Sequence, residues 1–87
     1  MKALSKLADR YSETEIDGEI VLMQLDSGDF FSLTGTAIEV WKSIDGVVTR
    51  NELINHLCGQ YDAERSEIAR DVDDLLDRLR SAQLLAD

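Results

Sequence analysis

The chain has no proline, one cysteine and five glycines among its 87 residues. With Cys58 alone, no internal disulfide can form, and a reducing compartment is the default expectation. The longest apolar run, Ile20 to Met23, is far too short to span a membrane. No apolar stretch of the kind found in signal peptides follows the N-terminus. These absences predict a cytoplasmic protein without membrane association.

Basic residues are also scarce. Nine Lys and Arg stand against 18 Asp and Glu, which gives a formal net charge of -9. The closest basic pairs, Arg65 with Arg70 and Arg78 with Arg80, are interleaved with aspartates. A field of this sign repels nucleic-acid phosphates. The charge balance therefore argues against nucleic-acid binding.

What the chain does contain is typical of one small globular domain. The hydrophobic fraction is 44%, and 87 residues leave room for a single domain over 1–87. Residues 1–9 have only a weak helical pattern and are expected to be loosely docked. Three strand-like segments follow, separated by an Asp-Gly pair that suits a type I′ turn and by an Asp-Ser-Gly turn. They cover residues 11–16, 19–25 and 29–33.

The third predicted strand has two faces. Phe31 and Leu33 point one way, and Phe30 and Ser32 point the other. We assign Phe31 and Leu33 to the core. Phe30 then lies on the opposite face, where it either covers the outer sheet surface or contacts a partner, and packing statistics favour the first reading.

Three helices are predicted after the strands. Thr34 or Gly35 caps the first, and Thr49 caps the second with a capping box. The third is expected from about residue 63 to 82, with Leu84 and Leu85 pinning the tail after it. The apolar positions recur at helical spacing. They are Ala37, Val40, Trp41 and Ile44, then Leu53, Ile54 and Leu57, then Ile68, Val72, Leu75 and Leu79.

The order of elements predicts an α+β fold. A three-stranded antiparallel sheet followed by three helices has the composition of a winged helix-turn-helix-like domain. No catalytic constellation is visible, because His56 and Cys58 are not neighbours on a helix and the aspartates of 71–77 lie within a helix. An i,i+4 pair between Asp74 and Arg78 is the simpler account of those charges. We therefore expect a binding protein without catalytic residues, metal or cofactor.

The run from Phe31 to Gly46 resembles a family signature. It matches the pattern aromatic-x-Leu-Asn-x-Thr-Ala/Gly-x-x-Ile/Val-Trp-x-x-Leu-Asp-Gly of the PqqD-like family, the precursor-peptide recognition elements of ribosomal peptide pathways. A second block runs from Asp71 to Leu79 and is followed by Leu84 and Leu85. The resemblance covers roughly residues 11–85. Two positions depart from the pattern, since Thr34 replaces the usual Asn and Gly35 stands where proline is frequent.

The resemblance implies that the chain binds the leader of a precursor peptide. In that family the leader adds as a fourth strand to the third strand and lies in a groove with the third helix. Main-chain bonds then give affinity and side-chain pockets give specificity. Carried over to this sequence, the peptide-binding residues are Asp29, Phe30, Phe31, Ser32, Leu33, Asp71, Leu75 and Arg78, with Leu76 if the third helix is rolled the other way.

The resemblance is strongest to the leader-recognition subunit of lasso-peptide systems. Its partners would be the precursor peptide, a leader peptidase and a macrolactam synthetase or another modifying enzyme. A pyrroloquinoline quinone pathway chaperone, which presents its peptide to a radical S-adenosylmethionine enzyme, is the alternative within the family. Outside it, a winged-helix DNA-binding regulator and a small adaptor remain open. An exposed third strand also leaves both a monomer and a weak dimer open.

Overall fold

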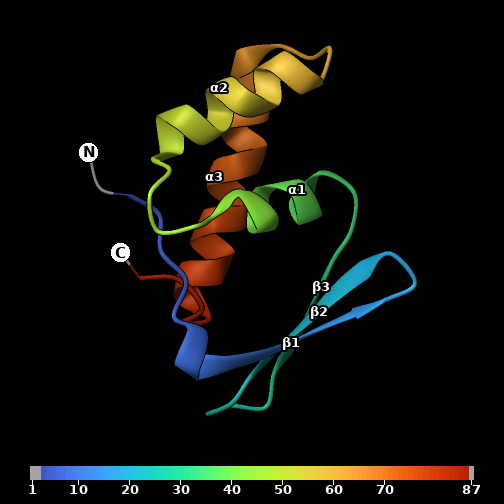
Figure 1. Ribbon diagram of the computed structural model, residues 1–87, viewed down its shortest axis with the longest axis vertical. Coiled ribbons are helices and arrows are strands. Elements are labelled where there is room, and N and C mark those ends of the chain that lie inside the picture. Colours follow the sequence, from blue (N-terminus) through green and yellow to red (C-terminus); the bar gives the residue numbers. More distant parts are fainter. Residues whose placement is uncertain (1–2, 87) are drawn as a thin grey trace.

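The computed structural model describes residues 3–86. Its sheet has the order β1-β2-β3, with β1 (Tyr11–Ile16), β2 (Glu19–Gln24) and β3 (Phe30–Leu33) all antiparallel (Figure 1). Asp17 and Gly18 have φ values of 50° and 81°, which confirms the predicted turn between β1 and β2. β2 and β3 are each one residue shorter than predicted.

Three helices pack on one side of this sheet: α1 (Thr36–Ser43), α2 (Arg50–Gln60) and α3 (Arg65–Ser81) (Figure 1). Together with the sheet they confirm the predicted α+β fold. At the start of α2 the Thr49 side chain accepts from the Glu52 N–H and Glu52 bonds back to the Thr49 N–H, so the capping box is present.

Gly35 is the N-cap of α1, and no side chain caps this helix. Its φ of 57° and ψ of -129° lie in a region that essentially only glycine adopts. Thr34 therefore does not cap the helix, and the turn from β3 into α1 depends on the glycine backbone instead.

The N-terminal segment is docked more firmly than its sequence predicts. Residues 1 and 2 lie outside the described residues, but Leu4 is buried and its N–H donates to the Val48 carbonyl at 2.7 Å. The Leu4 carbonyl accepts from Gly46 at 3.0 Å. A short 3-10 helix, η1 (Ala8–Arg10), then leads into β1. Residues 3–7 are thus docked, because their backbone groups pair with the region after α1 and with the C-terminal tail, while Ala8 and Asp9 are exposed.

The core lies between the inner sheet face and the helices, with Trp41 fully buried near its centre. The Trp41 indole N–H donates to Glu13 at 3.0 Å, and Tyr11 meets its ring edge-on at 5.3 Å between centroids. The Lys6 ammonium lies 4.2 Å from the centre of the same ring. Leu84 and Leu85 are buried, which confirms that they pin the tail.

Candidate functional site

β3 is an edge strand in the described sheet, and its free side faces α3. The Gln24 N–H donates to the Asp29 carbonyl at 2.9 Å, which fixes the alternation of bonds along β2 and β3. Phe31 and Leu33 accordingly turn both of their backbone groups toward β2. Asp29 turns only its carbonyl that way, since its N–H donates to Ser27 Oγ at 3.2 Å. The N–H and C=O of Phe30 and Ser32 therefore point to the open edge, where another chain could pair with them.

A hollow of about 240 Å³, which we term the central hollow, follows this open edge and separates β3 from α3. Leu75 and Leu79 are its apolar α3 wall, and Arg78 stands at its margin. The residues that line it are Phe30, Phe31, Ser32, Leu33, Leu75, Arg78 and Leu79.

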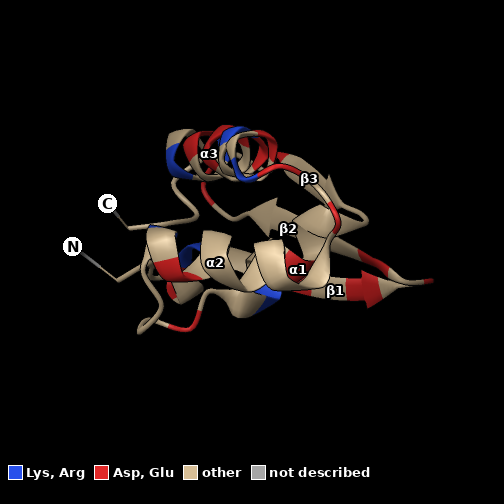
Figure 2. Ribbon diagram, turned by 90° about the horizontal axis from the view of Figure 1, so that it is seen from above, with Lys and Arg blue, Asp and Glu red and all other residues tan. Residues whose placement is uncertain are grey.

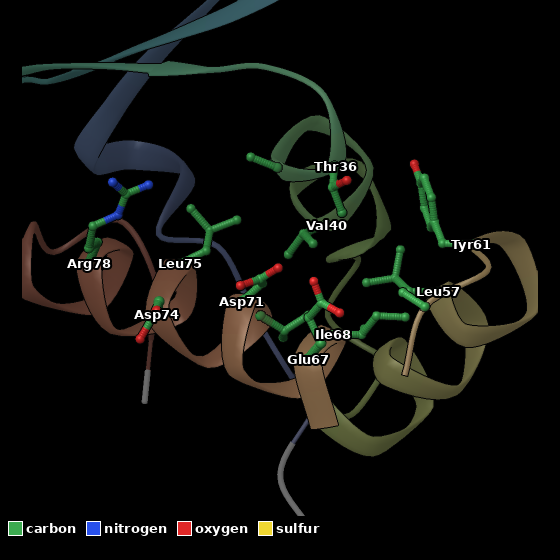
Figure 3. Close-up of a pocket in the computed structure, with 13 residues that line it drawn as sticks. Thr36, Val40, Leu57, Tyr61, Glu67, Ile68, Asp71, Asp74, Leu75 and Arg78 are labelled. Carbon is green, nitrogen blue, oxygen red and sulfur yellow. The ribbon is translucent and has the colours of Figure 1, made fainter. Parts of the chain in front are cut away.

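Two further hollows extend the central one in opposite directions. The end hollow, of about 470 Å³, lies where β3 begins and α3 ends, and is lined by Asp29, Phe31, Asp77, Arg78, Ser81 and Ala82. The helix pocket, also of about 470 Å³, lies among α1, α2 and α3 beyond the end of β3 (Figure 3). Arg78 lines all three hollows, so they adjoin one another along α3, and we refer to them together as the groove.

The groove gathers most of the residues that the sequence predicts for peptide binding. Phe30 to Leu33, Leu75 and Arg78 line the central hollow, Asp29 lines the end hollow and Asp71 lines the helix pocket. Leu76 is the exception. Its side chain is fully buried in the core and lines none of these hollows, which shows that α3 turns Leu75 toward the groove.

Phe31 and Phe30 take the two positions expected from their strand parity. Phe31 is half-buried and packs against the core, whereas Phe30 is 69% exposed. Phe30 pairs with Met23 across the sheet, on the face that carries no helix. It is therefore both an outer-face residue and part of the groove wall.

Charges on α3 are mixed (Figure 2). Asp73 makes two contacts of 2.5 and 2.8 Å with the Arg50 guanidinium of α2, which lower the pKa of the Asp73 carboxyl. Arg80 lies 3.5 Å from Asp77. The expected pair of Asp74 with Arg78 is not among the ion pairs within residues 3–86, so Arg78 keeps its charge free for the groove.

Sequence reasoning missed Glu67, Thr36 and Tyr61, which also line the helix pocket. Glu67 lies one turn before Asp71 on α3, so helical spacing alone could have placed the two on one face. Thr36 and Tyr61 reach the pocket only through the packing of α1 and α2 on α3. No pattern among neighbouring residues of the sequence predicts that packing.

Within residues 3–86 no group of three or more His, Cys, Asp or Glu could hold a metal ion. Across the same residues no helix is long and apolar enough to cross a bilayer. His56 is exposed and Cys58 half-buried on α2, and neither lines the groove.

Comparison with known proteins points to one family. The protein-family model described as coenzyme PQQ synthesis protein D (PqqD) matches residues 19–85. The structure of TbiB1 in complex with the TbiA(beta) leader peptide is similar over 100% of both chains, with 29% identity and a TM-score of 0.80. Lasso peptide synthetase B1 complexed with the leader peptide covers 97% of this chain and 98% of its own, with 20% identity and a TM-score of 0.83. The search of curated proteins gave no match.

Proposed function

The chain belongs to the PqqD family, and from that premise we propose that it is a leader-peptide-binding protein without catalytic activity. The leader of a ribosomal precursor peptide adds as a fourth strand to the open edge of β3 and fills the groove against α3. The observation that carries the proposal is the position of this edge, whose free backbone groups open onto a groove that Leu75 and Leu79 line on the α3 side. TbiB1, which is similar over 100% of both chains, was solved in complex with a leader peptide.

Main-chain pairing alone would not hold a leader. Phe30 and Ser32 offer four backbone groups, and at about 0.5–1.5 kcal/mol each they contribute roughly 2–6 kcal/mol. Fixing the backbone of four leader residues costs a comparable amount, about 4–8 kcal/mol. Burial of an aliphatic or aromatic side chain adds about 1.5–3 kcal/mol. Affinity therefore rests on leader side chains that enter the groove beside Leu75 and Leu79.

The geometry also defines which leader residues matter. Side chains alternate along a strand, so every second residue of the paired leader faces the groove and the others face solvent. Two apolar residues at positions i and i+2 of the leader would contact the central hollow. A charged leader residue near Arg78 would add about 0–1 kcal/mol, since that side chain is exposed.

We assign the protein to lasso-peptide biosynthesis, where it delivers the leader to a leader peptidase or a macrolactam synthetase. Similarity to lasso peptide synthetase B1 complexed with the leader peptide, beside that to TbiB1 with its leader peptide, favours this pathway. A quinone-pathway chaperone working with a radical S-adenosylmethionine enzyme is the second candidate, favoured by the description of the matching family model. Co-purification with a peptidase and synthetase, or with a radical enzyme, separates the two.

Titration of isotope-labelled protein with the leader encoded beside its gene tests the proposal. Saturable amide shifts should concentrate on residues 29–33 and on the groove face of α3. A scrambled leader of the same composition is the control. Saturable shifts confined to β1, or equal shifts with the scrambled peptide, would contradict strand addition at β3.

A further inference from the structure

The helix pocket extends the groove beyond the last residue of β3 and differs from the central hollow in chemistry (Figure 3). Its floor is apolar and comes from all three helices. Val40 comes from α1, Leu57 from α2, and Ile68 and Leu75 from α3. At about 470 Å³ it falls within the range of about 300–1,000 Å³ typical of ligand pockets. It is large enough for a long side chain.

Two carboxylates stand over this apolar floor. Glu67 and Asp71 lie one turn apart on α3, and Figure 3 shows both pointing toward α1 across the pocket, whereas Asp74 points away. Neither forms an ion pair within the described part of the chain, where the pairs involve other residues. Like charges at this spacing disfavour the free helix slightly. A cation between them would remove that cost.

We propose that the helix pocket binds a lysine or arginine side chain of the leader peptide, with the cation held between Glu67 and Asp71. This inference rests on the proposed function and names a specificity element of the same groove. A long basic side chain fits both halves of the pocket, because its alkyl stem covers apolar surface while its charged head meets the carboxylates. A purely apolar side chain would cover the carboxylates without pairing them, which costs free energy. An acidic side chain would be repelled.

Continuity of the groove sets the position of this basic residue. Leu75 and Arg78 line both the central hollow and the helix pocket, so one extended chain can occupy both. Thr36, at the pocket margin, follows Leu33 by three residues. At about 3.3 Å per residue, the lysine or arginine should lie roughly two to four residues beyond the segment paired with β3.

Selection from a random peptide library on the wild-type protein tests this inference. Selected peptides should carry an apolar pair at i and i+2 and, at a fixed spacing from it, an enriched Lys or Arg. The double variant Glu67→Gln/Asp71→Asn keeps the side-chain shapes and removes both charges, so it should select the apolar pair without the basic residue. Replacing that basic residue by norleucine should weaken wild-type binding roughly threefold to tenfold.

The matched control is Asp62→Asn/Glu64→Gln, which removes two charges next to the start of α3 but outside the pocket. This control variant should still select peptides enriched in Lys or Arg at the same spacing. Selected peptides that shift the β3 amides but carry no Lys or Arg enrichment would overturn the inference and leave the proposed function intact. Peptides that never shift those amides would overturn both. A wild-type dimer that dissociates in the Glu67→Gln/Asp71→Asn variant would assign the pocket to a second copy of the chain and overturn the inference.

Discussion

Replacement of Ser32 by proline isolates the main-chain contact on which leader binding depends. The Ser32 N–H points to the open edge of β3 and takes no part in pairing with β2. Proline is tolerated on edge strands at positions where the N–H faces away from the sheet. The variant should therefore keep the sheet while losing one donor to the leader.

The expected size of the effect follows from the lost bond. A buried leader carbonyl left without its donor costs about 1–2 kcal/mol, which is roughly a 5–30-fold increase in Kd. Fluorescence anisotropy with a labelled leader measures this increase directly. Ser32→Ala removes the side chain but keeps the N–H, so its Kd should stay near that of the wild type.

Folding of the variant is checked by thermal unfolding. For a chain of this length, a loss of 1 kcal/mol in the free energy of unfolding lowers Tm by about 4–8 °C. A Ser32→Pro protein whose Tm lies within that distance of the wild-type Tm therefore has an intact sheet. Phe31→Pro should lower Tm far more, because the Phe31 N–H faces β2. A folded Ser32→Pro protein that binds the leader as tightly as wild type would refute strand addition at this edge.

Three further changes test the fold and the groove. Gly35→Ala should lower the free energy of unfolding, measured in urea, by about 1–3 kcal/mol. The φ of 57° at this N-cap strains the backbone of an alanine, while its Cβ would meet no other atom within 4 Å. The backbone N–H groups of Val48 and Val47 donate to the Asp45 carboxylate and lower its pKa. This carboxylate therefore stabilises the fold above about pH 4, and the stabilisation is lost as the pH falls through the lowered pKa. In Asp45→Asn the acid limb of the unfolding profile should be flatter. Arg78→Ala should weaken leader binding roughly twofold to fivefold without changing Tm.

Matched variants control for these effects. Gly59→Ala, within α2 and with open space around it, should raise stability by up to about 1 kcal/mol instead of lowering it. Asp62→Asn, the control for Asp45→Asn, should leave the acid limb of the unfolding profile as steep as in the wild type. Arg70→Ala removes an exposed charge from α3 outside the groove and should leave the Kd unchanged. Equal increases in Kd for Arg70→Ala and Arg78→Ala would mean that leader binding depends only on the net charge of the protein and not on the position of Arg78.

Local signals in the sequence were sufficient for the sheet and for the start of α2. The Asp17-Gly18 turn and the Thr49–Glu52 capping box each depend on residues within a few positions of one another, and both are present. The cap of α1 was harder to assign. Thr34 is a good cap by residue type, but the chain enters the helix through a positive φ that only Gly35 accommodates.

Contacts between distant segments explain what the sequence could not indicate. The docking of Leu4 depends on backbone groups of Gly46 and Val48, more than 40 residues later. The choice of Leu75 over Leu76 for the groove depends on how α3 rolls against the sheet. Periodicity defines an apolar stripe, but it does not say which margin of that stripe stays open.

Residue-level hydrogen exchange of the free and leader-saturated protein tests the central claim most directly. In the free protein the Phe30 and Ser32 amides face the open edge and should exchange fast, while the Phe31 and Leu33 amides are already bonded to β2. Saturation with the leader should slow exchange at Phe30 and Ser32 selectively. Saturable binding that leaves both amides exchanging at the free rate would contradict the addition of a fourth strand to β3.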